Sequence, residues 1–149
     1  MPRLPVRPPS LVVPDLHLRI LYEGVDLNGR TITVSGDPKA LKLSEFQIKN
    51  GADRATGTIS LRLYFSKSVV STIPFNPNYP WQPTTSDENG FPTAFYASGV
   101  AVVNPTETWN WPAFVGSLTE DLDEVSARLK IFYGAAHPAE ANFVIRRKK

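Results

Sequence analysis

The sequence predicts an all-β protein, an antiparallel β-sandwich of about seven to nine short strands, and three observations support this fold class. In residues 58–66 the odd positions are apolar and the even positions are more polar, which is typical of a strand with one face in a core. The run from Val125 to Tyr133 repeats this alternation near the other end of the chain, and the two runs are expected to face each other from opposite layers of the sandwich. The chain contains 14 prolines, which break helices, and no segment shows a helical period over ten residues. The apolar positions expected to point inward are Ile59, Leu61, Leu63, Phe65, Val125, Ala127, Leu129, Ile131 and Tyr133.

The chain divides into an arm, one domain and a tail. Five prolines in residues 1–14 predict an extended, polyproline-like arm. Residues 15–145 are expected to form a single β-sandwich domain, since 149 residues suffice for one sizeable core. Residues 146–149 are a basic tail.

The first half of the domain is expected to consist of hairpins. Residues 16–22 alternate as a strand, and residues 30–35 return with apolar side chains on one face. The Asn28-Gly29 pair between them predicts a hairpin turn, so residues 16–35 are interpreted as one hairpin. In residues 41–49 the apolar phase slips by one position, which indicates a bulge near Ser44-Glu45. This strand and residues 58–66 are expected to be neighbours or partners across the core.

Two long loops interrupt the second half. Residues 71–93 carry five prolines with aromatic residues between them, and loops of this length inside a compact domain are usually functional or mobile. A strand over residues 94–103 follows, with Gly99 as its weak point, and residues 104–112 form a second aromatic loop. The final strand is expected over residues 142–146.

Charge and composition restrict the partners. A formal net charge of +2 is too small to imply a nucleic-acid partner, although the basic residues gather at the two ends. Those residues are candidate contacts of the arm and tail with neighbouring subunits, or simply solvated ends. No run is long enough to span a bilayer and no signal-peptide core is present, and we expect a virion or extracellular surface rather than the cytoplasm. The candidate contact residues are Arg3, Arg7, Arg146, Arg147, Lys148 and Lys149.

Catalysis is not expected. The chain has no cysteine, and its two histidines, His17 and His137, stand in no catalytic or metal-binding signature. No phosphate-binding loop or nucleophile elbow is present, and no cofactor is predicted.

One acidic cluster raises the question of a metal. Asp121, Asp123 and Glu124 could supply hard oxygen ligands to calcium. Their spacing falls short of an EF-hand loop, which needs more ligands and a glycine at its sharp turn. A solvated turn that opens the following strand is therefore the favoured interpretation.

Four aromatic residues in the proline-containing loops are the main candidates for partner or glycan binding: Tyr79, Trp81, Trp109 and Trp111. Indole rings stack on sugars and anchor protein interfaces. The alternative is that the loops fold back as a lid over an open end of the sandwich. The exposure of the three tryptophans discriminates between these readings.

Residues 46–65, Phe-Gln-Ile-Lys-Asn-Gly-Ala-Asp-Arg-Ala-Thr-Gly-Thr-Ile-Ser-Leu-Arg-Leu-Tyr-Phe, resemble a stretch of bacterial immunoglobulin-like, adhesion-type domains. The resemblance implies an immunoglobulin-like sandwich that binds or spaces without a catalytic site. The chain departs from true immunoglobulin domains in lacking a cysteine pair and a tryptophan in residues 58–66, and a jelly-roll arrangement stays open.

Three functional hypotheses follow. The preferred one is a non-catalytic protein-interaction or structural module, a homo- or hetero-oligomeric subunit or decoration component of a larger assembly such as a viral or phage particle or a cell-surface structure. The alternative is a carbohydrate-binding module that uses the loop tryptophans. A third is a jelly-roll capsid-type protein whose arginine-bearing ends contact nucleic acid.

Overall fold

The computed structural model describes residues 18–34, 39–44, 46–51, 55–73, 76, 79–111, 113–119, 123–133 and 138–147. These residues form 13 strands in three sheets, and none of them is helical, so the predicted all-β class is confirmed. The strand number exceeds the predicted seven to nine. The additional strands have two to four residues, which is too short for alternation to be visible in the sequence.

One layer of the sandwich is a six-stranded sheet. Its strands are antiparallel to their neighbours except for β3 and β13, which pair in parallel. The order across the sheet is β3 (Thr31–Val34), β13 (Ala139–Arg147), β12 (Glu124–Phe132), β6 (Ile59–Phe65), β9 (Thr93–Ala101) and β8 (Gln82–Thr84).

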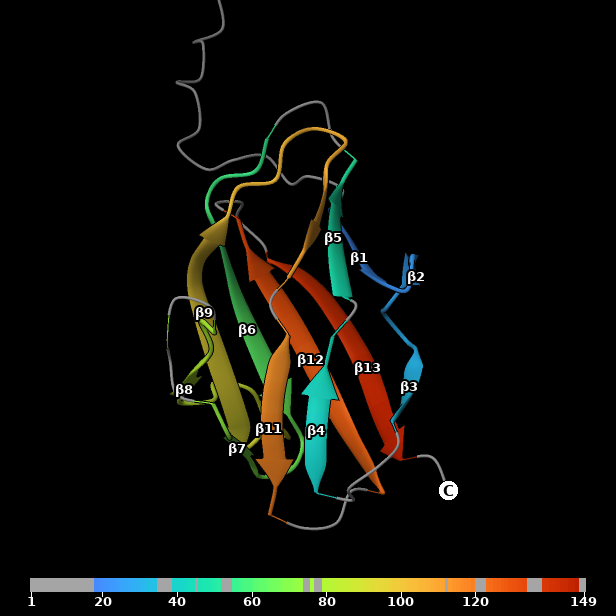
Figure 1. Ribbon diagram of the computed structural model, residues 1–149, viewed down its shortest axis with the longest axis vertical. Helices are drawn as coiled ribbons and strands as arrows, with labels where there is room; N and C mark the ends of the chain where they lie inside the picture. Colours follow the sequence, from blue (N-terminus) through green and yellow to red (C-terminus); the bar gives the residue numbers. More distant parts are fainter. Residues whose placement is uncertain are drawn as a thin grey trace, which may run out of the picture.

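The second layer is built from two smaller sheets. They lie one beyond the other along the strand direction, in front of the six-stranded sheet in Figure 1. The first sheet has the order β10 (Thr108–Asn110), β5 (Phe46–Asn50), β1 (Leu18–Tyr22) and β2 (Val25–Asp26). The second has the order β4 (Ala40–Leu43), β11 (Phe114–Leu118) and β7 (Val69–Ser71).

The inward register of the two long alternating segments is confirmed, because all nine apolar side chains expected to point inward are buried. Their mutual placement was predicted wrongly. We expected β6 and β12 in facing layers, but they are adjacent strands of one sheet, with Leu63 opposite Leu129. The layers are joined instead by ring contacts such as Phe46 with Phe143, whose centroids lie 5.8 Å apart.

The hairpin predicted over residues 16–35 was also wrong. The chain turns earlier, at Glu23-Gly24, where both residues have positive φ (51° and 80°) as a two-residue hairpin turn requires. Asn28-Gly29 instead carries the chain from β2 in one layer to β3 in the other. Gly29 donates its backbone N–H to the carbonyl of Asn142, and the Asn28 side chain accepts from the backbone N–H of Asn142.

The phase slip near residue 45 marks a change of sheet rather than a bulge within one strand. β4 ends at Leu43 and pairs with β11, whereas β5 begins at Phe46 and pairs with β1 and β10. A slip of one residue lets both segments keep their apolar side chains inward. Gly99 is the irregular point of β9, as predicted. It has a φ of 59° and lies where the register with β6 shifts.

Candidate functional site

Two of the three tryptophans belong to the core. The exposed fractions of Trp81 and Trp111 are 0% and 5%, and their rings meet edge to face at 6.0 Å. The Trp81 ring also lies edge-on to Phe114 at 6.0 Å. Trp109, on β10, is half-buried against the core. The three rings therefore do not form a common exposed platform, and the arrangement matches the alternative in which the loops fold back on the sandwich.

Tyr79, the fourth aromatic candidate, is buried and joins the proline-rich segment to β7 and β11. Its hydroxyl donates to the Val115 carbonyl at 2.9 Å and accepts from the Val115 backbone N–H at 3.1 Å. The Ser71 hydroxyl donates to it at 3.2 Å. These contacts fix the edge strand β7 and the proline-rich segment to the smaller layer.

The acidic turn and the tail are joined to each other. Glu124 forms an exposed ion pair of 2.7 Å with Arg146, and the backbone N–H of Arg147 donates to the Asp123 carbonyl. β13 runs through Arg147, so the first half of the predicted tail is part of the sheet. Within the described ranges no three His, Asp or Glu side chains are grouped to hold a metal ion. The arm (residues 1–14, with Arg3 and Arg7), His17, Asp121, His137, Lys148 and Lys149 lie outside the described residues.

The outward side of the three-stranded sheet is small and nearly uncharged. Its five outward residues, here called the open face, are Ala40, Lys42, Val70, Val115 and Ser117. Val115 lies opposite Lys42, and Ser117 lies between Ala40 and Val70. Val70 is 52% exposed although it is an aliphatic residue in a strand. This face thus combines β-branched apolar surface with a single charge.

A groove of about 300 Å³ borders the open face. It lies between β7, which ends the three-stranded sheet, and β8 and β9 of the opposite layer. Pro83 lies within β8, and a proline on an edge strand removes a backbone donor and discourages further pairing. Among the described strands β7 pairs only with β11, so its other edge faces this groove. The apolar lining comes from Val69, Val70, Pro83, Pro92, Ala94 and Phe95.

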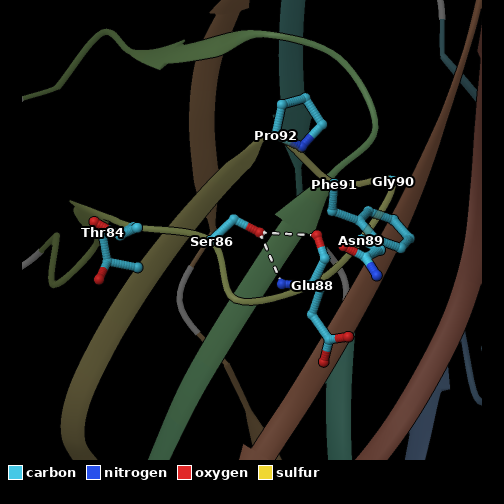
Figure 2. Close-up of a pocket in the computed structure, with 8 residues that line it drawn as sticks. Thr84, Ser86, Glu88, Asn89, Gly90, Phe91 and Pro92 are labelled. Carbon is cyan, nitrogen blue, oxygen red and sulfur yellow. Dashed lines mark hydrogen bonds between the residues drawn. The ribbon is translucent and has the colours of Figure 1, made fainter.

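A second feature covers the outward side of the six-stranded sheet. Residues 85–92, here called the strap, connect β8 to β9 and contact β6 and β12 on that side. The strap is shaped by a turn in which the Ser86 hydroxyl accepts from the Glu88 backbone N–H at 3.3 Å (Figure 2). The same hydroxyl donates to the Glu88 carbonyl, and a shallow hollow of about 400 Å³ lies along the strap.

Two carboxylates hold the strap to a strip of cations. Arg62 and Lys130 lie directly opposite each other on β6 and β12, where like charges repel. Asp87 accepts from Arg62 at 3.2 Å. Glu88 pairs with Lys130 and, at 3.1 Å, with Arg128. The carboxylates of the strap therefore offset the repulsion within the sheet.

Aromatic contacts complete the strap. The Phe91 ring lies under the Arg128 guanidinium at 4.7 Å and edge-on to the Tyr64 ring at 6.2 Å. Tyr64 occupies an outward position of β6, yet its exposed fraction is 0% because the strap covers it. Its hydroxyl donates to the Asp87 carboxylate at 2.8 Å. The strap thus buries an aromatic residue on the side of the sheet that faces away from the core.

The pKa values reflect this burial. Burial and the hydrogen bond to Asp87 raise the pKa of Tyr64 to about 12, because both favour the neutral phenol. The same hydrogen bond lowers the pKa of Asp87, because it favours the carboxylate. The pKa of Tyr96, beside Arg62, is lowered by hydrogen bonds from Ser98 and Ser60.

Comparisons with known proteins concern the fold alone. No family model and no curated protein matches the chain. Among solved structures, a PapD-like domain of human CEP192 is 8% identical, with a TM-score of 0.42 over 100% of this chain and 97% of that one. A type I cohesin from Pseudobacteroides cellulosolvens is 9% identical, with a TM-score of 0.40 over 79% and 91%. AvmM, described as catalysing macrocyclization in alchivemycin A biosynthesis, is 11% identical, with a TM-score of 0.47 over 96% of both chains. Such distant likeness carries no family and no function with it, and the sandwich class is shown by the strands and sheets themselves.

Sequence reasoning missed both the open face and the strap. β7 and β4 are too short to show alternation, so the exposed Val70 gave no signal. The strap was part of the long 71–93 loop, and its acidic pair was not connected with the outward cations of β6 and β12. The opposite charges of the two segments are visible in the sequence and could have suggested the contact.

No described segment forms a helix long and apolar enough to cross a membrane.

Proposed function

We propose that this protein is a non-catalytic interaction module, a subunit or decoration component of a larger assembly, that binds a protein neighbour through the open face. The observation that carries the proposal is Val70, an aliphatic residue 52% exposed on the edge strand of a sheet whose outward side is nearly uncharged. Interface centres are depleted of charged residues relative to the remaining surface, and the open face has this composition.

The groove beside β7 strengthens the proposal. A partner on the open face can place an apolar side chain in this groove against Pro83 and Pro92, which are exposed. Tyr79 and Ser71 hold β7 in place, so the surface is already ordered before binding. Less conformational entropy is lost when a preorganised surface binds.

The arm and the tail fit the same proposal. Arg3, Arg7, Lys148 and Lys149 would contact a neighbouring subunit, and Arg146 and Arg147 would direct the tail from the end of β13. A proline-rich arm loses less conformational entropy on binding, because its prolines already restrict the free chain.

Fluorescence-detected sedimentation of labelled protein in an extract of its own organism tests the proposal. The wild type is expected to sediment in a complex larger than the monomer, and Val70→Asp is expected to sediment as the monomer. Val25→Asp is the matched control, since Val25 is 57% exposed on β2, away from the open face. Identical profiles for wild type and Val70→Asp would contradict the proposal.

A further inference from the structure

The strap is an acidic segment seated on a basic and aromatic surface of its own protein. It presents the order acid, acid, two small or polar residues and an aromatic ring, from Asp87 and Glu88 to Phe91. The surface beneath supplies Arg62, Arg128 and Lys130 together with the Tyr64 ring. Each chemical feature of the strap meets a complementary group on the sheet.

The strap is not needed to close the core. Its contacts are with outward residues of β6 and β12, while the inward residues of those strands are buried against the other layer. Without the strap, Arg62 and Lys130 would lose their carboxylate partners among the described residues, whereas Arg128 would keep its 3.1 Å ion pair with Glu140 of β13. A cluster of like charges around an aromatic ring, on a firmly paired sheet, favours an anionic ligand that also carries an aromatic group.

We propose that the strap is an internal pseudo-ligand, and that the surface beneath it binds an acidic segment of a partner protein with an aromatic residue about three positions after an acid pair. The partner segment would replace the strap on Arg62, Arg128, Lys130 and Tyr64. The strap keeps the surface closed until a competing segment arrives. This surface belongs to the six-stranded sheet, so the proposal is independent of the open face.

The strap is covalently attached to β8 and β9, and this attachment explains why it stays bound to the surface beneath it. A short tether gives an attached segment an effective concentration in the millimolar range, so a weak free peptide cannot displace it. Weakening the strap should therefore reveal binding without any change to the surface beneath. Removing charge-assisted hydrogen bonds from the strap is expected to raise the apparent affinity for a free acidic peptide about tenfold or more.

The test uses a fluorescent synthetic peptide that copies residues 84–93, and fluorescence anisotropy against the full chain. The variant Asp87→Asn/Glu88→Gln is expected to bind the peptide about tenfold or more tightly than the wild type does, and less tightly as salt rises. Adding Arg128→Gln/Lys130→Gln should abolish this binding. Asp26→Asn/Glu107→Gln is the control, since it removes the same charge from two exposed carboxylates elsewhere.

Other outcomes would overturn the proposal. Equal affinity of wild type and Asp87→Asn/Glu88→Gln would show that the strap does not compete, and binding that survives Arg128→Gln/Lys130→Gln would place the peptide elsewhere. A variant that binds a fluorescent single-stranded oligonucleotide but not the peptide would assign the surface to nucleic acid. Circular dichroism confirms folding. If the double variant unfolds, Asp87→Asn alone takes its place, because the Asp87 side chain is 61% exposed.

Discussion

The hydroxyl of Tyr64 lies 2.8 Å from the carboxylate of Asp87, and this contact joins the middle of the six-stranded sheet to the strap. It is the principal cause of the lowered pKa of Asp87, and it contributes to the raised pKa of Tyr64. The strap is therefore expected to respond to acid and to alkali at different residues.

Tyr64→Phe should destabilise the protein by about 1 kcal/mol at pH 7, since it removes one hydrogen bond to a largely exposed carboxylate. A carboxylate whose pKa is lowered by folding stabilises the folded state above its unfolded pKa, and this contribution is lost as the pH falls through the folded pKa. The difference between wild type and Tyr64→Phe should thus shrink below about pH 4. Urea unfolding at pH 7 and pH 3 measures it, and an equal difference at both would contradict the assignment.

Alkaline pH should weaken the fold through Tyr64 itself. Its folded pKa of about 12 lies above the unfolded value near 10, so the unfolded state loses the proton first. The stabilisation is complete below pH 10 and disappears as the pH rises toward 12. The free energy of unfolding should fall more steeply over this interval in the wild type than in Tyr64→Phe. Parallel pH profiles would show that the phenol is not buried by the strap.

Gly116→Ala should destabilise the protein by about 1–3 kcal/mol, because a methyl group at this position has no room. A Cβ on Gly116 would lie 2.8 Å from the Phe114 ring and 2.9 Å from the Val70 carbonyl. Thermal unfolding measures the loss. The adjacent Ser117→Ala, on the open face, is the control and should unfold within about 0.5 kcal/mol of the wild type; equal stability of the two variants would contradict the packing of β11 against β7.

Tryptophan emission should be dominated by buried rings. Trp81 and Trp111 are in the core, so most of the fluorescence should be blue-shifted and resist quenching by iodide. Trp109→Ala should remove the most readily quenched part, and it should not change retention on immobilised glycans, because the three tryptophans do not form a common exposed platform. Loss of glycan retention in a folded Trp109→Ala would support the carbohydrate alternative instead.

Local pattern was enough to predict the main strands. Alternation in β6 and β12 depends only on which side each residue faces, and burial of Leu61 and Leu129 follows from it. Which sheet a strand joins is not a local property. The Asn28-Gly29 pair looked like a hairpin turn, but its backbone and side chain are held by Asn142, 114 residues away, and the chain crosses between layers there.

The candidate sites were harder to predict because they depend on contacts between distant segments. Trp81 lies in a proline-rich stretch that predicts surface loop, yet its ring fills the space between Trp111 and Phe114. The alternation of β6 places the Tyr64 side chain on the side that faces away from the core. It is buried because the strap covers it. Exposure of Val70 depends on β7 being the last strand of its sheet.

Binding of a protein neighbour to the open face can be measured with a photo-crosslinking amino acid placed at position 70 in the native organism. We expect a discrete protein adduct from position 70 and none from the control position 33, an exposed site on β3 in the other layer. No adduct from position 70, or the same adducts from both positions, would contradict it.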